Sequence, residues 1–481
     1  MSQPCKENFS SLLCTTLDTF GYSHDIKNAR VYTMEKLAES LSKQATSKLR
    51  LITNSDIRLT SYIVGSRSEG VTNMFQSDFD VMSVLNEFVC VDTPCEERNL
   101  CVFKPEYKNS PPGYVRLIAK FTEFNDLTPG IYISEQNEMY FSSVSLTKLL
   151  LNTHILRDNI LPTHPLIQNV VRSSVGPSIN KTFDLSFAGW NSKPENDSVF
   201  AIYMYTSNIS KRWSSGAGRN GWPSQELVNE ITSIEGFLVP VGEKESENEL
   251  LEWRISYVTT EKKLLCSLNS TQNKLYALLK MISKEVIKPN QSGISSYMMK
   301  NIVLWMADRN SSSLFVPSLM VDRIMQSLNF LKVCLLNNHL PNYLIPERNL
   351  LAGRITSKTK EPLIDSITAL LEEGKEIFSR IPKIAKCFTI MLNFRESALA
   401  YGKWRDQVEK KILELVVFEM DNDCDSPLHD VVDESTSRPQ YHGILLQLII
   451  LIFPDLFSQY LQNSRTNITE TVVQRFKMIF E

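Results

Sequence analysis

The 481-residue sequence contains little glycine and no closely spaced cysteine pairs, and each lack excludes a class of protein. Only 17 residues are glycine, below the average usage of about 7%, which weakens any interpretation based on Gly-rich loops or many tight turns. The nine cysteines are scattered without Cys-x-x-Cys spacing, and the six histidines do not cluster with them. We therefore expect reduced thiols, with neither a disulfide framework nor a zinc site.

The sequence also lacks an excess of charge of either sign and a long apolar run. Its 51 Lys and Arg residues nearly balance 54 Asp and Glu residues, which argues against a protein coated in positive charge but leaves a local basic face possible. The longest apolar run, residues 443–453, is about half of the roughly 20 residues needed to cross a bilayer. The first residues lack the apolar stretch of a secretory signal. We expect a cytoplasmic protein with no membrane partner.

Helical periodicity is clearest near the N-terminus. Residues 25–50 carry apolar side chains at helical spacing, which predicts one long helix. On the opposite side of that helix lie Lys36, Lys43 and Arg50, since residues advance by about 100° each. This basic face is a candidate surface for a nucleic acid. The alternative is an ordinary solvated face, because Glu35 and Glu39 lie beside it and dilute its charge.

Strand-like and helical patterns then follow one another along the chain. Strands are predicted at residues 61–66, 79–85, 113–118 and 198–203, and helices are predicted between 142 and 171, ahead of a turn at 173–178. From residue 225 the pattern is mostly helical, with an extended stretch at 253–259 and clear helices at 272–288, 295–308 and 321–337. A further helical block follows a break at 346–354, and residues 421–439, which are acidic and rich in turn formers, read as an exposed linker.

One pair of motifs indicates chemistry. Gly65-Ser66 is followed after eleven residues by Asp78-Phe79-Asp80, and strand alternation places both carboxylates on one face. Adjacent carboxylates repel unless cations lie between them, and such pairs hold Mg²⁺ for phosphoryl transfer. Gly65 and Ser66 allow a backbone turn and a hydroxyl to approach a nucleotide phosphate. A strand with two solvent-facing acids is the alternative.

These residues belong to a longer stretch, VGSRSEGVTNMFQSDFDVMSVL (64–85), that resembles the catalytic segment of the Mab family of nucleotidyltransferases. This family contains cyclic GMP-AMP synthase and the animal cyclic GMP-AMP synthase-like receptors. The resemblance covers roughly residues 10 to 355 and is closest to the invertebrate receptors; its further segments are GWPS (221–224), FLVPVG (237–242), LEWRISYVTTEKKLL (251–265), LLKMI (278–282), SSYMMKNIVLW (295–305) and NYLIPERNLL (342–351).

The resemblance implies an α+β, two-lobed nucleotidyltransferase fold. Its expected parts are a mixed sheet lobe with an N-terminal spine helix (1–224), a helical lobe (225–355) and a C-terminal helical extension of unknown role (356–481). It also implies a third metal carboxylate before a later strand. Asp197 fits this position. Asp184 is the rival candidate, and its alternative role is that of an ordinary turn residue before Gly189. Together with Asp78 and Asp80, the third carboxylate would hold two Mg²⁺ or Mn²⁺ ions.

Roles for nucleotide-binding residues follow from the same resemblance. Gly65 and Ser66 would contact the triphosphate, Lys280 and Ser296 would hold phosphates of the donor nucleotide, Tyr297 would stack on a base, and Arg254 with Ser256 would read the partner base. A guanidinium fork suits a guanine edge or a phosphate, and Lys offers a point charge. Two of these residues have alternative roles. Lys280 could extend from an apolar helix to the surface, and Tyr297 could be an ordinary core residue.

The sequence departs from the vertebrate enzyme in two places. Residues 264–275 contain one cysteine and no histidine where that enzyme has a zinc thumb, and Val258 stands where it has Ser. Recognition of long DNA through zinc is therefore not expected.

We expect a synthase that binds ATP and GTP and makes a cyclic dinucleotide, such as cyclic GMP-AMP, in innate immune and antiviral signalling. Double-stranded RNA is the favoured activator, ordering a mobile loop at residues 67–77. The alternatives are a catalytically silent interaction protein with the Mab fold and a template-independent polymerase that extends RNA ends.

Overall fold

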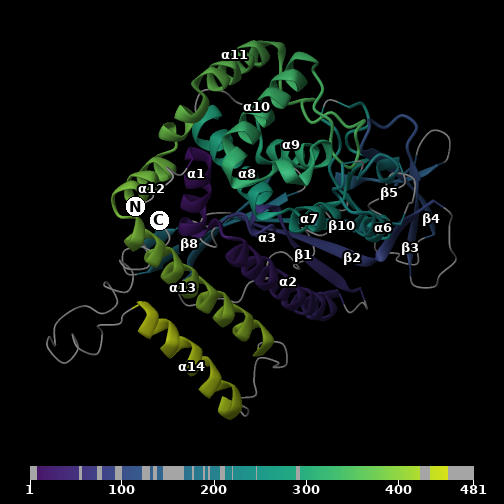
Figure 1. The fold of residues 1–481 in the computed structure, drawn as a ribbon. Coiled ribbons are helices and arrows are strands. Elements are labelled where there is room, and N and C mark those ends of the chain that lie inside the picture. Colours follow the sequence, from purple (N-terminus) through teal and green to yellow (C-terminus); the bar gives the residue numbers. More distant parts are fainter. Residues whose placement is uncertain are drawn as a thin grey trace.

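The computed structural model has a lobe built on a β-sheet, a lobe of helices, and further helices at the C-terminal end (Figure 1). This arrangement confirms the predicted α+β fold class. The structure describes residues 8–53, 57–72, 78–92, 100–121, 131–133, 138–144, 167–175, 178–187, 190–192, 195–205, 212–218, 220–244, 246–288, 293–422 and 434–452.

Six strands of the sheet lobe close into a ring. In the order β2, β3, β4, β12, β11 and β10 each strand pairs with the next, and β10 pairs back with β2. β1 flanks β2, while β8 and β7 extend from β10. The strands are β1 (Leu59–Val64), β2 (Phe79–Val91), β3 (Cys101–Glu106), β4 (Tyr114–Phe121), β5 (Ile131–Ile133), β6 (Met139–Phe141), β7 (Ile167–Val175), β8 (Ser178–Phe187), β9 (Trp190–Ser192), β10 (Glu195–Tyr205), β11 (Gly236–Val239) and β12 (Glu252–Ser256). Because β11 and β12 follow residue 224, the sheet continues past the first expected segment.

The long N-terminal helix α2 (His24–Thr53) supports this sheet. It follows α1 (Phe9–Leu17) and lies along β1 (Figure 1). Ser61 N–H donates a hydrogen bond to Ser42 Oγ at 2.8 Å, and Leu59 N–H donates to Thr46 Oγ1 at 3.0 Å. An unpaired strand edge tends to recruit another strand. Side chains of α2 prevent this by accepting hydrogen bonds from backbone N–H groups along the edge of β1. The expected apolar side chains of α2 are buried, namely Met34, Leu37, Leu41, Ala45 and Leu49.

The helical lobe forms where the sequence periodicity predicts it. A short helical turn, α3 (Gly65–Ser68), follows β1. The later helices are α6 (Gln225–Thr232), α7 (Val258–Cys266), α8 (Ser270–Met281), α9 (Ser296–Arg309), α10 (Met320–Leu336) and α11 (Ser357–Glu373). Asn269 and Gln272 form a reciprocal capping box that fixes the start of α8. The described side chains of Leu275, Leu278 and Leu279 on α8 are almost fully buried, so this helix forms the centre of the lobe's core.

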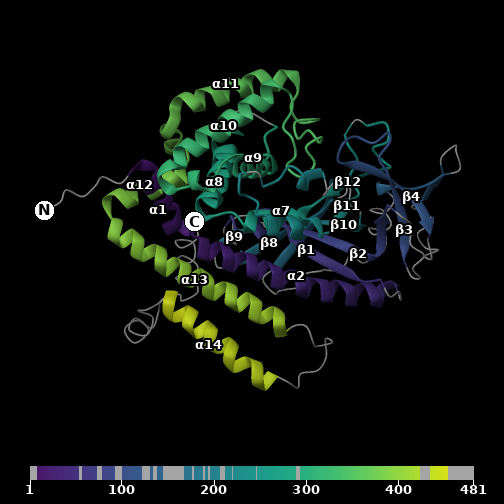
Figure 2. The ribbon, with the colours of Figure 1, turned by 45° about the vertical axis from the view of Figure 1, so that its right-hand side comes forward.

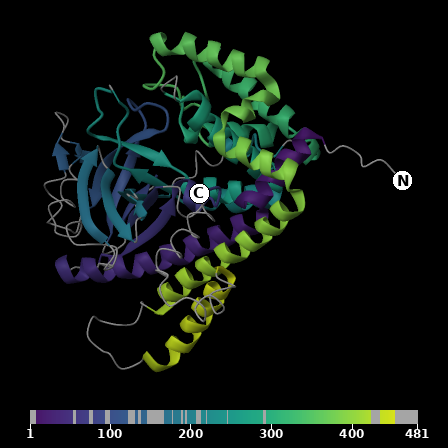
Figure 3. The ribbon, with the colours of Figure 1, turned by 90° about the vertical axis from the view of Figure 1, so that its left-hand side faces the viewer.

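Two long helices of the C-terminal extension lie on the outside of α2. After α12 (Pro382–Asn393), α13 (Arg395–Asn422) lies alongside α2, and α14 (Glu434–Ile452) lies on the far side of α13 (Figures 2 and 3). Val408, Leu448 and Ile452 form the apolar contact between α13 and α14. No helix in the described ranges is long and apolar enough to cross a membrane.

Four sequence-based predictions of local structure are wrong in part. The strand predicted at 61–66 ends at Val64, and residues 65–66 begin α3. Residues 167–171 form β7, not helix, because their β-branched residues pair with β8; residues 145–166 of the same prediction lie outside the described ranges. The stretch at 253–259 is extended only to Ser256, and α7 begins at Val258. In the predicted linker, residues 421–422 end α13 and 434–439 begin α14. Glu434 lies in the first turn of α14, where a negative charge is favourable, so acidic composition alone does not indicate a loop.

Candidate functional site

Two of the predicted carboxylates meet on neighbouring strands. β2 and β10 run parallel, and Asp80 and Asp197 are directly opposite each other in their register. Asp78 directly precedes β2 and is exposed, whereas Asp80 and Asp197 are half-buried. Asp184 lies on β8, opposite Asn169 of β7, and β10 separates β8 from β2.

The backbone makes a tight turn at Gly65 and contacts the side chain of Asp80 there. Its φ of +72° lies in the left-handed region that favours glycine, and a Cβ at this position would overlap Oδ2 of Asp80. Ser66 lies in the short helix α3 that follows, where Ser68 Oγ donates a hydrogen bond to Gly65 O at 2.9 Å. The guanidinium of Arg67 lies 5.4 Å from the centre of the Phe79 ring. Residues 73–77 of the expected mobile loop lie outside the described ranges.

The electrostatics of this turn suit a bound cation. Burial, followed by the charges of Asp197 and Asp78, raises the pKa of Asp80 to about 6. Burial lowers the pKa of Lys280 on α8 to about 8, while the charges of Glu69 and Asp80 oppose that shift. Carboxylates that raise one another's pKa are stabilised when a cation lies between them. In the part of the chain that the structure describes, however, no three His, Cys, Asp or Glu side chains are close enough together to hold a metal ion.

A buried ionic cluster joins this turn to the helical lobe. Lys300 on α9 forms ion pairs with Glu69 at 2.5 Å and with Glu261 at 3.0 Å, and all three side chains are at most 8% exposed. Burial alone would lower the pKa of Lys300, but the charges of Glu261 and Glu69 outweigh burial and hold this pKa well above its ordinary value. Tyr276 donates to Glu69 at 2.9 Å. Sequence reasoning missed this cluster, although Glu69 lies four residues from Gly65 and Lys300 lies within the segment that carries Tyr297.

Tyr297 and Arg254 line one hollow of about 150 Å³. The Tyr297 hydroxyl donates to Glu261 at 2.6 Å and accepts from Asn342 at 2.9 Å, so its ring is held in place. Burial and the nearby Arg348 lower the pKa of Arg254. The sequence did not single out three further cationic side chains of this lining, which are Lys244, Arg348 and Arg354. Against these four cations the lining has one carboxylate, Glu243, so the hollow suits an anionic or electron-rich group.

Two further predicted nucleotide contacts, Ser256 and Ser296, do not line this hollow. Ser256 is half-buried at the end of β12, two residues from Arg254. Ser296 is the exposed first residue of α9 and follows Ser295, whose Oγ accepts from Met298 N–H at 3.3 Å. Ser295 and not Ser296 lines the hollow.

The predicted basic face of α2 is partly neutralised. Lys36 is half-buried and forms an ion pair with Glu39 at 2.8 Å, one turn further along the helix. Lys43 and Arg50 are exposed on the same helix. Glu35, next to Lys36, pairs with Lys262 of α7 at 3.0 Å.

Comparison with protein families finds a match in the helical lobe. Residues 271–369 match the Mab-21 protein HhH/H2TH-like domain. The matched range begins in α8 and ends within α11, beyond the lobe boundary expected at residue 355. The Mab-21 C-terminal domain belongs to the superfamily of nucleotidyltransferases that includes cyclic GMP-AMP synthase, and the sheet lobe with its helical region agrees with a nucleotidyltransferase-like fold.

Proposed function

We propose that the protein is a metal-dependent nucleotidyltransferase that makes a cyclic dinucleotide from ATP and GTP. The observation that carries this proposal is the register of β2 and β10, which puts Asp80 opposite Asp197 with the Gly65 turn against Asp80. The raised pKa of Asp80 supports it, because the same crowding that raises the pKa favours a bound divalent cation. The Mab-21 domain in the helical lobe supports the class of reaction.

The residues of the site have complementary roles in this proposal. Asp78, Asp80 and Asp197 would hold two Mg²⁺ or Mn²⁺ ions, with Asp197 preferred to Asp184 because Asp197 is in register with Asp80. When bound, such ions favour loss of the proton from the attacking hydroxyl and neutralise charge on the leaving pyrophosphate. Gly65 and Ser66 hold the triphosphate, and Lys280 and Ser296 bind phosphates of the donor nucleotide.

The hollow lined by Arg254 and Tyr297 holds a base of the partner nucleotide, and Ser256, two residues after Arg254 on β12, reads that base with Arg254. A ribose hydroxyl of one nucleotide attacks the α-phosphorus of the other. The new P–O bond forms as the bond to pyrophosphate breaks, and the hydroxyl proton passes to water. A second transfer within the same site closes the ring, so the product is a small phosphodiester and not an extended RNA.

A ligand controls this activity in our proposal. Double-stranded RNA binds the part of α2 where Lys43 and Arg50 are exposed, and favours the conformation in which residues 67–77 complete the site. Lys36 contributes less, because Glu39 offsets its charge. Binding of this kind weakens steeply with salt, and the product serves as a second messenger in innate immune signalling in the cytoplasm.

One observation favours a second function, a catalytically silent interaction protein. Leu446 and Ile450 on α14 are each 52% exposed, although α13 covers the opposite side of that helix. Exposed apolar side chains grouped on one helix are typical of protein-binding surfaces. This function requires no turnover of nucleotides.

The test incubates the purified full chain with ATP, GTP and Mg²⁺ or Mn²⁺, with and without double-stranded RNA or DNA, and resolves the products by mass. A phosphatase-resistant cyclic dinucleotide that disappears in Asp80→Asn supports the synthase. Elongated RNA would indicate a polymerase. A folded wild-type protein that stays inert with every added nucleic acid would favour the interaction protein.

A further inference from the structure

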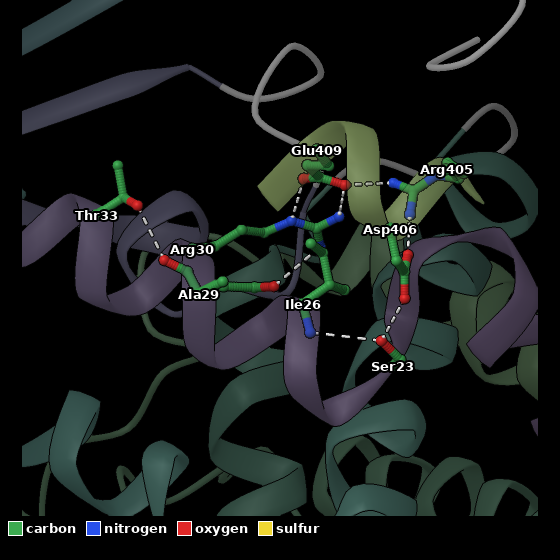
Figure 4. A network of polar contacts seen from close by, with 9 residues as sticks. Ser23, Ile26, Ala29, Arg30, Thr33, Arg405, Asp406 and Glu409 are labelled. Carbon is green, nitrogen blue, oxygen red and sulfur yellow. Dashed lines mark hydrogen bonds and ion pairs between the residues drawn. The ribbon is translucent and has the colours of Figure 1, made fainter. Parts of the chain in front are cut away.

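A buried ionic network joins the C-terminal extension to the spine helix (Figure 4). Glu409 on α13 accepts two hydrogen bonds from Arg30 on α2, from Nε at 2.6 Å and from Nη2 at 2.9 Å. Arg405 Nη2 donates to the same carboxylate at 2.6 Å and its Nη1 donates to Asp406 at 2.7 Å. The side chains of Arg30, Glu409 and Arg405 are at most 3% exposed. A fork of this kind fixes the orientation of a guanidinium more closely than a single contact does.

Arg30 also reaches the turn that follows Gly65. Its third nitrogen, Nη1, donates to the carbonyl oxygen of Gly70 at 3.2 Å. Gly70 has a φ of +71°, and a Cβ there would lie 2.6 Å from the carbonyl oxygen of Lys27 on α2. The turn therefore lies directly against α2, and the guanidinium of Arg30 is in contact with α13 at one end and with this turn at the other.

The segment from Gly65 to Gly70 is thus held at both ends. Gly65 lies against Asp80, Glu69 pairs with Lys300 of the helical lobe, and Gly70 accepts from Arg30. A shift of Arg30 would release the hydrogen bond next to Glu69. The orientation of Arg30 depends in turn on Glu409, which belongs to the C-terminal extension.

The backbone near this network is shaped for close contact. A Cβ on Gly402 of α13 would lie 2.8 Å from the carbonyl oxygen of Thr19, and a Cβ on Gly21 would overlap the guanidinium of Arg405. Although burial opposes it, Arg30 and Arg405 hold the pKa of Glu409 below its ordinary value. Burying this charge network has a large desolvation penalty, and the two close approaches restrict positions 402 and 21 to glycine. A helix that only covered a surface would need neither feature.

We propose that Glu409 is a positioning residue for the nucleotide site: it orients Arg30, which fixes the Gly70 carbonyl and so the turn that carries Gly65 and Ser66. The C-terminal extension is then a working part of the site and not an appended module. The catalytic consequence of this inference rests on the proposed function, but the structural coupling does not. It can therefore be tested without any turnover.

The test compares three variants of the full chain by hydrogen exchange of the backbone amides of residues 65–72. Glu409→Gln leaves Arg30 without its charged partner. The double variant Arg30→Met with Glu409→Leu removes both members of the pair, while Arg405 keeps its hydrogen bond to Asp406, and it leaves the Gly70 carbonyl without the donor from Arg30. Val408→Ala, next to Glu409 and fully buried against α14, is the control that loosens α13 without touching Arg30.

We expect exchange at residues 65–72 to rise at least about tenfold in Glu409→Gln and in the double variant, and to stay at the wild-type rate in Val408→Ala. If the double variant is as stable as wild type and residues 65–72 keep wild-type protection, the network only attaches α13 and the inference is wrong. Equal loss of protection in Val408→Ala would also overturn it. With ATP and GTP, a synthase should show a raised KM in both network variants. A wild-type protein without turnover would contradict the proposed function while the exchange result still decides the coupling.

Discussion

Replacing Gly65 by alanine is the smallest change that should damage the proposed site. The residue has a φ of +72°, so any side chain there costs roughly 1–2 kcal/mol of conformational strain. In addition, the new Cβ would overlap Oδ2 of Asp80. To restore an ordinary contact of 3.4 Å, the carboxylate oxygen must withdraw by about 1 Å.

The strain and the displacement have different measurable effects. A misplacement of about 1 Å in a catalytic group can reduce the rate about 10²-fold, so we expect Gly65→Ala to lose at least that factor in dinucleotide synthesis and to bind Mn²⁺ more weakly. Gly374→Ala is the matched control, because Gly374 has a φ of +60° and nothing lies within 4 Å of its would-be Cβ. This control should lose stability but keep its activity.

Two assays measure these effects. Thermal unfolding reports the strain in both variants, and titration with Mn²⁺ followed by electron paramagnetic resonance reports the carboxylates without requiring turnover. If Gly65→Ala binds Mn²⁺ and makes product as the wild type does, the close approach of Gly65 to Asp80 has no part in the chemistry. If Gly374→Ala loses as much activity as Gly65→Ala, backbone strain alone explains the result, and the reasoning from Asp80 is refuted.

Three further predictions concern charge. Glu409→Gln should lower the free energy of unfolding, measured by urea denaturation at pH 7, by about 3–5 kcal/mol, because it removes the negative charge that two buried guanidinium groups share. The wild type should lose this advantage as the pH falls below the ordinary Glu pKa of 4.5 and through the lowered pKa of Glu409. The variant should show no such loss in this pH range. The affinity for Mg·ATP, measured by calorimetry, should fall as pH rises through about 8, where Lys280 loses its proton, and Lys280→Met should bind weakly with no such step. Lys43→Glu with Arg50→Glu should weaken RNA binding and reduce the slope of log K against log[salt] by the equivalent of about two phosphate contacts. Unchanged binding would exclude this face of α2 as the RNA site.

Features within one element were predictable from the sequence. The periodicity of α2 predicted both its buried apolar side and its exposed Lys43 and Arg50, because a helix repeats its pattern every few residues. The strand that carries Asp80 was predicted from the apolar residues that follow, and it begins at Phe79, directly after Asp78.

Features that depend on distant elements were not predictable. The register that sets Asp197 beside Asp80 depends on how β10 pairs with β2, and strands far apart in sequence give no local signal for their register. Glu409 and Arg30 each sit in a mixed polar pattern that reads as solvated helix surface, because burial of a single charged residue depends on its partner. The same holds for Arg348, whose break region indicated only an irregular segment.

The most direct test of the proposed site is a comparison of Asp197→Asn with Asp184→Asn in synthesis of the cyclic dinucleotide, measured by mass after incubation with ATP, GTP, Mn²⁺ and double-stranded RNA. Both changes remove one negative charge from a strand of the same lobe, but only Asp197 is in register with Asp80. We predict that Asp197→Asn abolishes the product and that Asp184→Asn retains it. Retention of product in Asp197→Asn, with its loss in Asp184→Asn, would contradict the assignment of the site.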